Sequence, residues 1–177
     1  PGSDMTQEYI PGESALAPEA GKNGWSQPVY FFDDRIDLLS YYHEPSGVVS
    51  YAFTRFSVPM ETQAELWIGY DESITVYLNG QKVHSFNGTT TFSDAELVKV
   101  KPKITVRAGE NSLLVKTYHK YGDYSFTLNI CEVESNSYYA GNRLPGLTFY
   151  TSSLTGTDDL VANCARAEHV FAVYLYP

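Results

Sequence analysis

The 177-residue sequence has no long apolar run, few cysteines and no excess of basic residues. No apolar run approaches the roughly 18 residues that a membrane-spanning helix needs, so we expect no membrane insertion. Two cysteines, Cys131 and Cys164, are too few for a disulfide-rich scaffold or a cysteine-based zinc site. The 12 Lys and Arg against 21 Asp and Glu leave a net charge of −9, which argues against a nucleic-acid partner.

Helical periodicity and catalytic motifs are also scarce. The one helical pattern covers Asp33 to Tyr42, where Ile36 and Leu39 share a face over two turns. The sequence contains no Gly-x-Ser-x-Gly, no His-Glu-x-x-His and no glycine-rich phosphate loop. Its four histidines are scattered, and none pairs with another at the spacing of metal ligands. We therefore expect that the chain is not an enzyme.

What the sequence does contain is alternation of apolar and polar residues with period two. Hydrophobic residues make up 43%, enough for the core of one domain. Alternation over Tyr51 to Val58, Ile74 to Leu78 and Tyr124 to Ile130 predicts strands, and Asn79-Gly80 predicts a two-residue hairpin turn of type I′. The spacing predicts an all-β antiparallel sandwich or jelly roll with at least eight strands. Its expected core includes Ile74, Val76, Leu78, Leu113, Val115, Phe126 and Leu128.

The chain divides into three parts by composition. Pro1-Gly2-Ser3 is typical of a remnant of cloning, and the following residues mix Pro, Gly, Ala and Glu without periodicity. We therefore expect residues 1–22 to be a tag and a surface leader or linker. Residues 23–133 are expected to form the sandwich, and residues 134–177 to add further strands to it. We also expect the chain to be a fragment of a longer precursor.

Several motifs follow one another in an informative order. The chain contains, in this order, an acidic pair, a strand, an Asn-Gly turn, a Gly-x-Asn turn and a Leu-Leu-Val-Lys strand. The segments that carry the pattern are Val49–Thr54, Ala64–Glu72, Ile74–Val83, Ala108–Lys116 and Gly122–Leu128. This order resembles the galactose-binding-like jelly-roll domains of secreted bacterial glycoside hydrolases and surface proteins, over about residues 25 to 132. The acidic pair is Asp71-Glu72 here rather than two Asp, which leaves the role of that pair open.

The resemblance implies a non-catalytic carbohydrate-binding or accessory module of a larger secreted or cell-surface protein, with a glycan-degrading enzyme as the expected parent. Its partners would be an oligo- or polysaccharide and the neighbouring domains. The alternative is a structural or adhesive β-sandwich that spaces domains or contacts another protein. No cofactor is required, although such domains often hold a structural Ca²⁺. The nearest rich source of carboxylates is Asp33, Asp34 and Asp37, although an acidic helix N-terminus is the favoured interpretation of these residues.

The excess of aromatic residues, 15% of the chain, points to where a sugar would bind. Exposed rings stack on the apolar faces of sugars, and nearby polar groups bond the hydroxyls. A turn of the chain brings together Tyr118, His119, Tyr121 and Asp123, and we predict the ligand site there, with Tyr42 and His43 as neighbours. The alternative is that these tyrosine hydroxyls close polar contacts across the hairpin. Trp25 is a further candidate stacking platform.

Two pairs of residues carry weaker predictions. Asp71 and Glu72 could hold a ligand hydroxyl or a cation, but a solvated loop pair is the favoured interpretation. Cys131 and Cys164 would commonly pair in a secreted chain, so we predict a disulfide between them, with two buried free thiols as the alternative.

Overall fold

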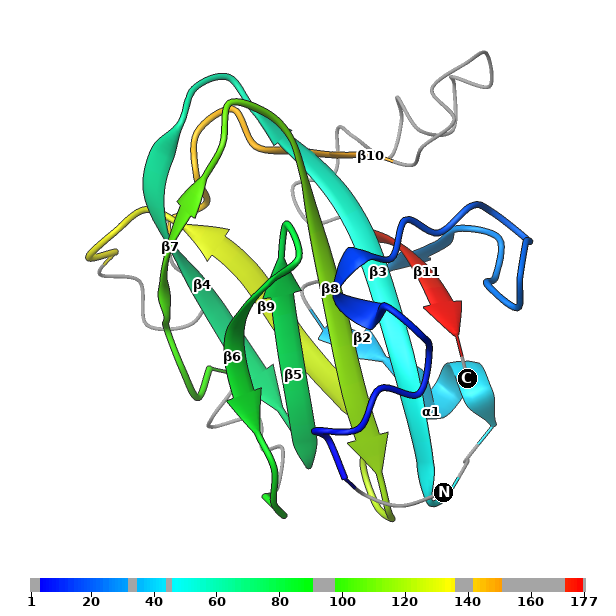
Figure 1. Cartoon of the computed structure of the whole chain (residues 1–177). Helices are drawn as coiled ribbons and strands as arrows, with labels where there is room; N and C mark the ends of the chain where they lie inside the picture. The colour runs from blue at the N-terminus through cyan, green and yellow to red at the C-terminus, as the bar shows by residue number, and fades with distance from the viewer. Residues whose placement is uncertain are drawn as a thin grey trace.

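Two antiparallel sheets make up most of the computed structural model, which describes residues 4–31, 35–43, 46–90, 98–135, 142–150 and 171–176 (Figure 1). The larger sheet has the order β1 (Val29–Phe31), β11 (Phe171–Tyr176), β3 (Val48–Val58), β8 (Gly109–His119), β5 (Ser73–Leu78) and β6 (Gln81–Phe86), with β10 (Thr148–Tyr150) also beside β3. The smaller sheet has the order β2 (Arg35–Asp37), β9 (Ser125–Cys131), β4 (Thr62–Tyr70) and β7 (Lys103–Val106). The all-β class is confirmed, and the architecture is that of a β-sandwich.

Helix is confined to two short elements among the described residues: the 3-10 turn η1 (Glu13–Ala15) and α1 (Leu38–Tyr42). Within the expected helix over Asp33–Tyr42, residues 35–37 form strand β2 and residues 38–42 form α1. Ile36 lies instead in β2, where it pairs with Phe126 and is buried. The sequence pattern did not separate the two cases, because a single buried apolar residue is compatible with a helix and with a strand. No helix in the described part of the chain has the length and apolarity to cross a membrane.

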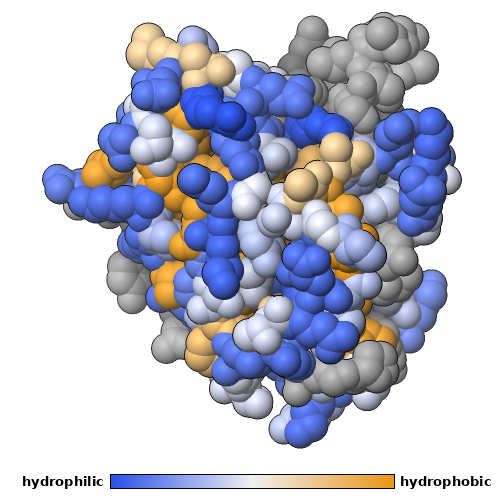
Figure 2. Space-filling view, viewed as in Figure 1, coloured by the Kyte–Doolittle hydropathy of each residue, from blue (hydrophilic) through white to orange (hydrophobic). Residues whose placement is uncertain are grey.

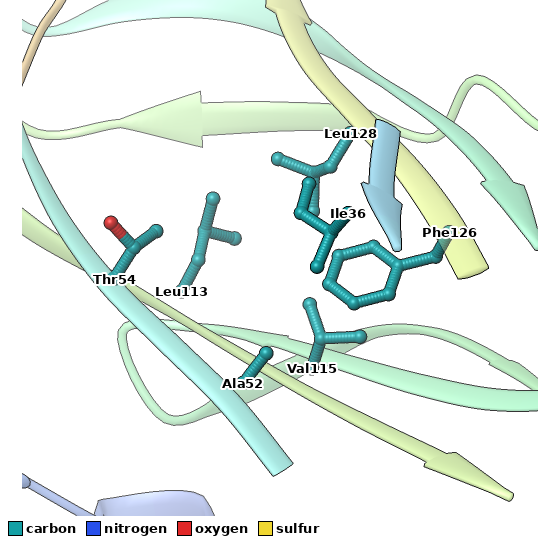
Figure 3. A pocket seen from close by; sticks show the side chains of 7 residues that line it. All are labelled: Ile36, Ala52, Thr54, Leu113, Val115, Phe126 and Leu128. Atoms are coloured by element: carbon teal, nitrogen blue, oxygen red, sulfur yellow. The ribbon is translucent and has the colours of Figure 1, made fainter. Parts of the chain in front are cut away.

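The core lies between the two sheets and contains all seven residues predicted for it. Within it, a gap of about 10 Å³ separates side chains of β3 and β8 from those of β2 and β9 (Figure 3). Six of the seven lining side chains are apolar, and the gap is too small for any ligand. The lining residues are Ile36, Ala52, Thr54, Leu113, Val115, Phe126 and Leu128.

The predicted hairpin at Asn79-Gly80 is confirmed. Strands β5 and β6 are antiparallel neighbours, with Leu78 opposite Gln81. Asn79 and Gly80 have φ angles of 51° and 81°, both in the left-handed region that a type I′ turn requires.

Replacing Gly80 with alanine is expected to destabilise the fold by more than the same change at Gly109. Both residues have left-handed φ angles, 81° and 79°, so each substitution carries a strain of about 1–2 kcal/mol. A Cβ at Gly80 would also lie 3.1 Å from the Ser14 carbonyl oxygen, whereas one at Gly109 meets nothing within 4 Å. Urea unfolding of both variants measures the difference, and equal losses would contradict the close approach.

Two asparagines join this turn to the turn between β7 and β8. Asn79 Nδ2 donates to Asn111 Oδ1 at 2.8 Å, and the Ser112 N–H donates to Asn79 Oδ1 at 2.9 Å. Asn111 Oδ1 also accepts from the Arg107 N–H at 3.0 Å, while its Nδ2 donates to the Arg107 and Gly109 carbonyls. Asn111 is buried, so these bonds fix the geometry of the Gly-x-Asn turn.

The outer face of the larger sheet is covered by residues 4–25, which we call the N-terminal strap. Figure 1 shows this segment in blue, with η1 in front of β3 and β8. Met5 and Trp25 are buried, and Trp25 packs with Tyr51, Phe53 and Leu114 in a second hydrophobic cluster. Trp25 is therefore part of this cluster and offers no exposed stacking platform. In Figure 2, hydrophilic and intermediate residues make up most of this face, and hydrophobic ones appear in patches between them.

A buried ion pair fixes the strap to the sheet. Lys116 of β8 has no exposed side-chain surface, and its Nζ lies 3.0 Å from both carboxylate oxygens of Glu13. The same ammonium group donates to the carbonyls of Met5 at 3.2 Å and Gln7 at 2.6 Å. These three partners, Met5, Gln7 and Glu13, all belong to the segment that was expected to be a leader or linker.

Two tyrosines complete the surroundings of Glu13. The hydroxyls of Tyr51 and Tyr77 donate to its carboxylate oxygens at 2.6 and 2.8 Å. Burial raises the pKa of both hydroxyls well above the ordinary value, and the bond to Glu13 raises it further. Both tyrosines therefore remain protonated hydrogen-bond donors.

Candidate functional site

The turn between β8 and β9 and the segment from α1 to β3 meet at one end of the sandwich. Ser46 Oγ donates to the carbonyl of Lys120 at 3.0 Å. The N–H groups of Leu38 and Leu39 both donate to the carbonyl of Tyr124, at 2.9 and 3.0 Å. These contacts bring together the two chain segments from which the ligand site was predicted. We call this region the turn end.

Exposed aromatic rings gather at the turn end. Among the described residues, three large hydrophobic side chains are exposed: Tyr41 (37%), Tyr121 (63%) and Met60 (67%). Both tyrosines belong to the turn end. Lys120 Nζ lies 5.2 Å from the centroid of the Tyr121 ring. The rings of Tyr41 and Tyr42 form a T-shaped pair with 4.8 Å between their centroids.

Charged groups flank these rings. Asp123 is exposed and lies 3.9 Å from the Arg35 guanidinium, measured from Oδ1 to the nearer terminal nitrogen. His43 is exposed at the C-cap of α1, where it adopts a left-handed φ of 56°. The turn end thus presents exposed aromatic rings together with side chains that donate and accept hydrogen bonds.

The predicted site residues divide between surface and interior. Tyr121, Asp123 and His43 are exposed, while Tyr118 and Tyr42 are half-buried. Burial raises the pKa of the Tyr42 hydroxyl well above its ordinary value. His119 is only 2% exposed, so its ring does not reach the surface beside Tyr121.

Beneath the turn end, His119 lies beside the acidic pair. Asp71 and Glu72 are 7% and 6% exposed, so the favoured expectation of a solvated loop pair is wrong. The reason is strand pairing: Ser73 of β5 lies opposite Tyr118 of β8, which places the residues before β5 next to the end of β8. One ligand atom from each of Asp71, Glu72 and His119 lies within 4.8 Å of the others.

The neighbours of this cluster orient its members. The Lys120 N–H donates to Glu72 Oε2, and His119 Nδ1 lies 3.9 Å from the same oxygen. The His119 ring stacks on Tyr124 with 4.5 Å between centroids and 18° between planes. Tyr124 shares a 2.8 Å hydrogen bond with Thr117 Oγ1, and burial raises the pKa of its hydroxyl to about 12. The histidine ring therefore packs against a buried, protonated tyrosine.

The carboxylates predicted for calcium have a different placement. Asp37 is the N-cap of α1, and its two side-chain oxygens accept from the N–H and hydroxyl of Ser40. This is the helix N-terminal role expected as the alternative to an ion site. Asp33 and Asp34 lie outside the described residues, so calcium binding there stays a prediction.

The predicted disulfide also stays a prediction. Cys131 is buried at the end of β9, where its backbone pairs with that of Arg143 in an isolated antiparallel β-bridge. Cys164 lies outside the described residues.

A groove lies at the other end of β3. Its volume is about 350 Å³, and its walls include Val58, Pro59, Met60 and Pro145 but no aromatic ring among the residues that the structure describes. Comparison with protein-family models, with curated proteins and with solved structures gives no match to this chain.

Proposed function

We propose that the chain is a non-catalytic carbohydrate-binding module of a larger secreted or cell-surface protein, with a glycan-degrading enzyme as its parent. The observation that carries the proposal is the exposure of Tyr121, 63%, on a turn beside charged side chains. A sugar would lie on the Tyr121 ring, and Asp123 and Arg35 would bond its hydroxyls. Tyr41 and His43 would extend the surface towards α1.

The chemistry of the turn end suits a sugar. A pyranose ring presents C–H groups on its faces and hydroxyls at its rim, so it needs an apolar platform with polar groups around it. The Tyr121 ring is open to solvent, which favours weak binding, with a Kd of about 10 μM to 1 mM. Linkage to a parent protein or repeated epitopes would raise the effective affinity.

A protein-contact role is the second candidate, and a different observation favours it. Met60 is 67% exposed and lines the groove of about 350 Å³ at the other end of the sandwich. The described lining of this groove is mostly aliphatic and contains no aromatic ring, which fits a side chain of a neighbouring domain better than a sugar. This role would place the contact far from Tyr121.

Replacing Tyr121 with alanine is expected to weaken glycan binding at least tenfold, equivalent to about 1.4 kcal/mol, because the stacking platform is lost. Tyr121→Phe keeps the ring and should retain most of the affinity. A glycan array identifies the ligand, and titration of the 15N-labelled protein with that oligosaccharide measures Kd and maps the site. A negative array would overturn the proposal, as would a loss of binding on Met60→Ala rather than on Tyr121→Ala.

A further inference from the structure

We infer that Asp71, Glu72 and His119 form a binding site for a divalent transition-metal ion, with Zn²⁺ the best match. This inference does not rest on carbohydrate binding. It starts from three side chains of metal-ligating type that come from two strand ends and converge in the interior.

The distances fit a single small ion. Zn²⁺ binds imidazole nitrogen at about 2.0–2.1 Å and carboxylate oxygen at about 2.0–2.2 Å, so tetrahedral geometry places two ligand atoms of one ion about 3.5 Å apart. His119 Nδ1 and Glu72 Oε2 are already 3.9 Å apart. The three ligand atoms lie within 4.8 Å of one another, so side-chain movements of about 1 Å or less would bring all of them to the separations of a tetrahedral site.

Charge and burial favour an ion here. Asp71 and Glu72 are more than nine-tenths buried, and His119 is almost completely so. Burying a carboxylate is costly unless its charge is compensated. A divalent cation bound to two carboxylates and a neutral imidazole gives a site with no net charge.

The donor set selects the kind of ion. Calcium and magnesium take oxygen ligands, calcium six to eight of them, so an imidazole disfavours both. One nitrogen and two carboxylates suit Zn²⁺ and its first-row neighbours. Three protein ligands would leave one tetrahedral position for water.

The surroundings of the ligands resemble those of built metal sites, in which outer partners hold the ligands in place. The backbone N–H of Lys120 bonds Glu72 Oε2, and Tyr124 stacks on the His119 ring. An ion would therefore connect the β4–β5 loop to the end of β8. We expect it to stabilise this end of the sandwich.

The test uses the full chain after treatment with a chelator. Equilibrium dialysis against Zn²⁺ should give one tightly bound ion per chain, and Co²⁺ should give visible absorption bands from a nitrogen-containing, low-coordinate site. Zn²⁺ should raise Tm more than Ca²⁺ or Mg²⁺ at the same concentration. Glu72→Gln and His119→Gln should each weaken Zn²⁺ binding at least tenfold.

Two controls separate loss of the site from loss of the fold. His84→Gln removes a histidine of β6 that lies outside the cluster, and its Zn²⁺ affinity should equal that of the unchanged chain. Circular dichroism shows whether each variant is folded, and Asp71→Asn provides a milder third change. Absence of Zn²⁺ and Co²⁺ binding to the unchanged chain overturns the inference. Binding that survives in folded Glu72→Gln and His119→Gln variants overturns it as well.

Discussion

Replacing Lys116 with methionine is expected to lower the free energy of unfolding by about 3–5 kcal/mol. Methionine fills nearly the same space, so the change removes the charge rather than the packing. Glu13, which is 2% exposed, would then be a buried carboxylate without its ammonium partner. The strap would lose the contacts of Met5 and Gln7 to Lys116 at the same time.

Urea unfolding of a set of variants tests this expectation. The double variant Glu13→Gln/Lys116→Met should be more stable than Lys116→Met alone, because it leaves no uncompensated charge. Lys82→Met, at an exposed position of β6, should change stability by no more than about 0.5 kcal/mol. A loss below about 1 kcal/mol for Lys116→Met would mean that water replaces the ion pair at little cost.

The second large effect is expected for Asn111→Ala, which should destabilise the fold by about 2–4 kcal/mol. The change removes an acceptor used by Asn79 and the Arg107 N–H, and a donor to the Arg107 and Gly109 carbonyls. Asn111 is only 1% exposed, so water does not easily replace these bonds. Thermal and urea unfolding measure the loss.

Two further variants sharpen this prediction. Asn111→Asp keeps the acceptor but loses the donor, and should lie between alanine and the unchanged chain. Asn87→Ala, at an exposed position, should be nearly neutral. A neutral Asn111→Ala would contradict the role of the two asparagines in joining the turns.

Local patterns in the sequence predicted most of the sandwich. Ile74, Val76 and Leu78 alternate with polar neighbours, and Asn79-Gly80 supplies two left-handed residues. Both signals depend only on residues close in sequence, so they need no knowledge of the partner strand. The galactose-binding-like type and the jelly-roll connections remain predictions.

The strap and its ion pair were beyond such patterns. Glu13 and Lys116 meet only because the chain returns across the outer face of the larger sheet. The strap has no regular periodicity, since it covers the sheet mainly as irregular chain with one 3-10 turn. An isolated lysine between Val115 and Thr117 indicates an exposed face unless a distant carboxylate is known to cover it.

The buried cluster was missed for a similar reason. Asp71 and Glu72 are polar residues in a short connection, which is ordinarily solvated. If the pairing of β5 with β8 had been predicted, it would have placed Asp71 and Glu72 next to His119. The alternation of apolar and polar residues in both strands is the signal that could have predicted this pairing. The turn residues Tyr121 and Asp123 were easier to place at the surface because Gly122 marks a tight turn, with a φ of 90°.

The position of β11 bears on how the chain folds as it is made. This strand lies between β1 and β3, with Val173 opposite Val29 and Tyr174 opposite Phe53. A ribosome completes β1 and β3 long before it reaches residue 171, so the strand edges that pair with β11 stay unpaired during most of the synthesis. Open strand edges invite pairing with other chains. Chaperone protection of β1 and β3 during translation would therefore matter most in the interval before β11 emerges.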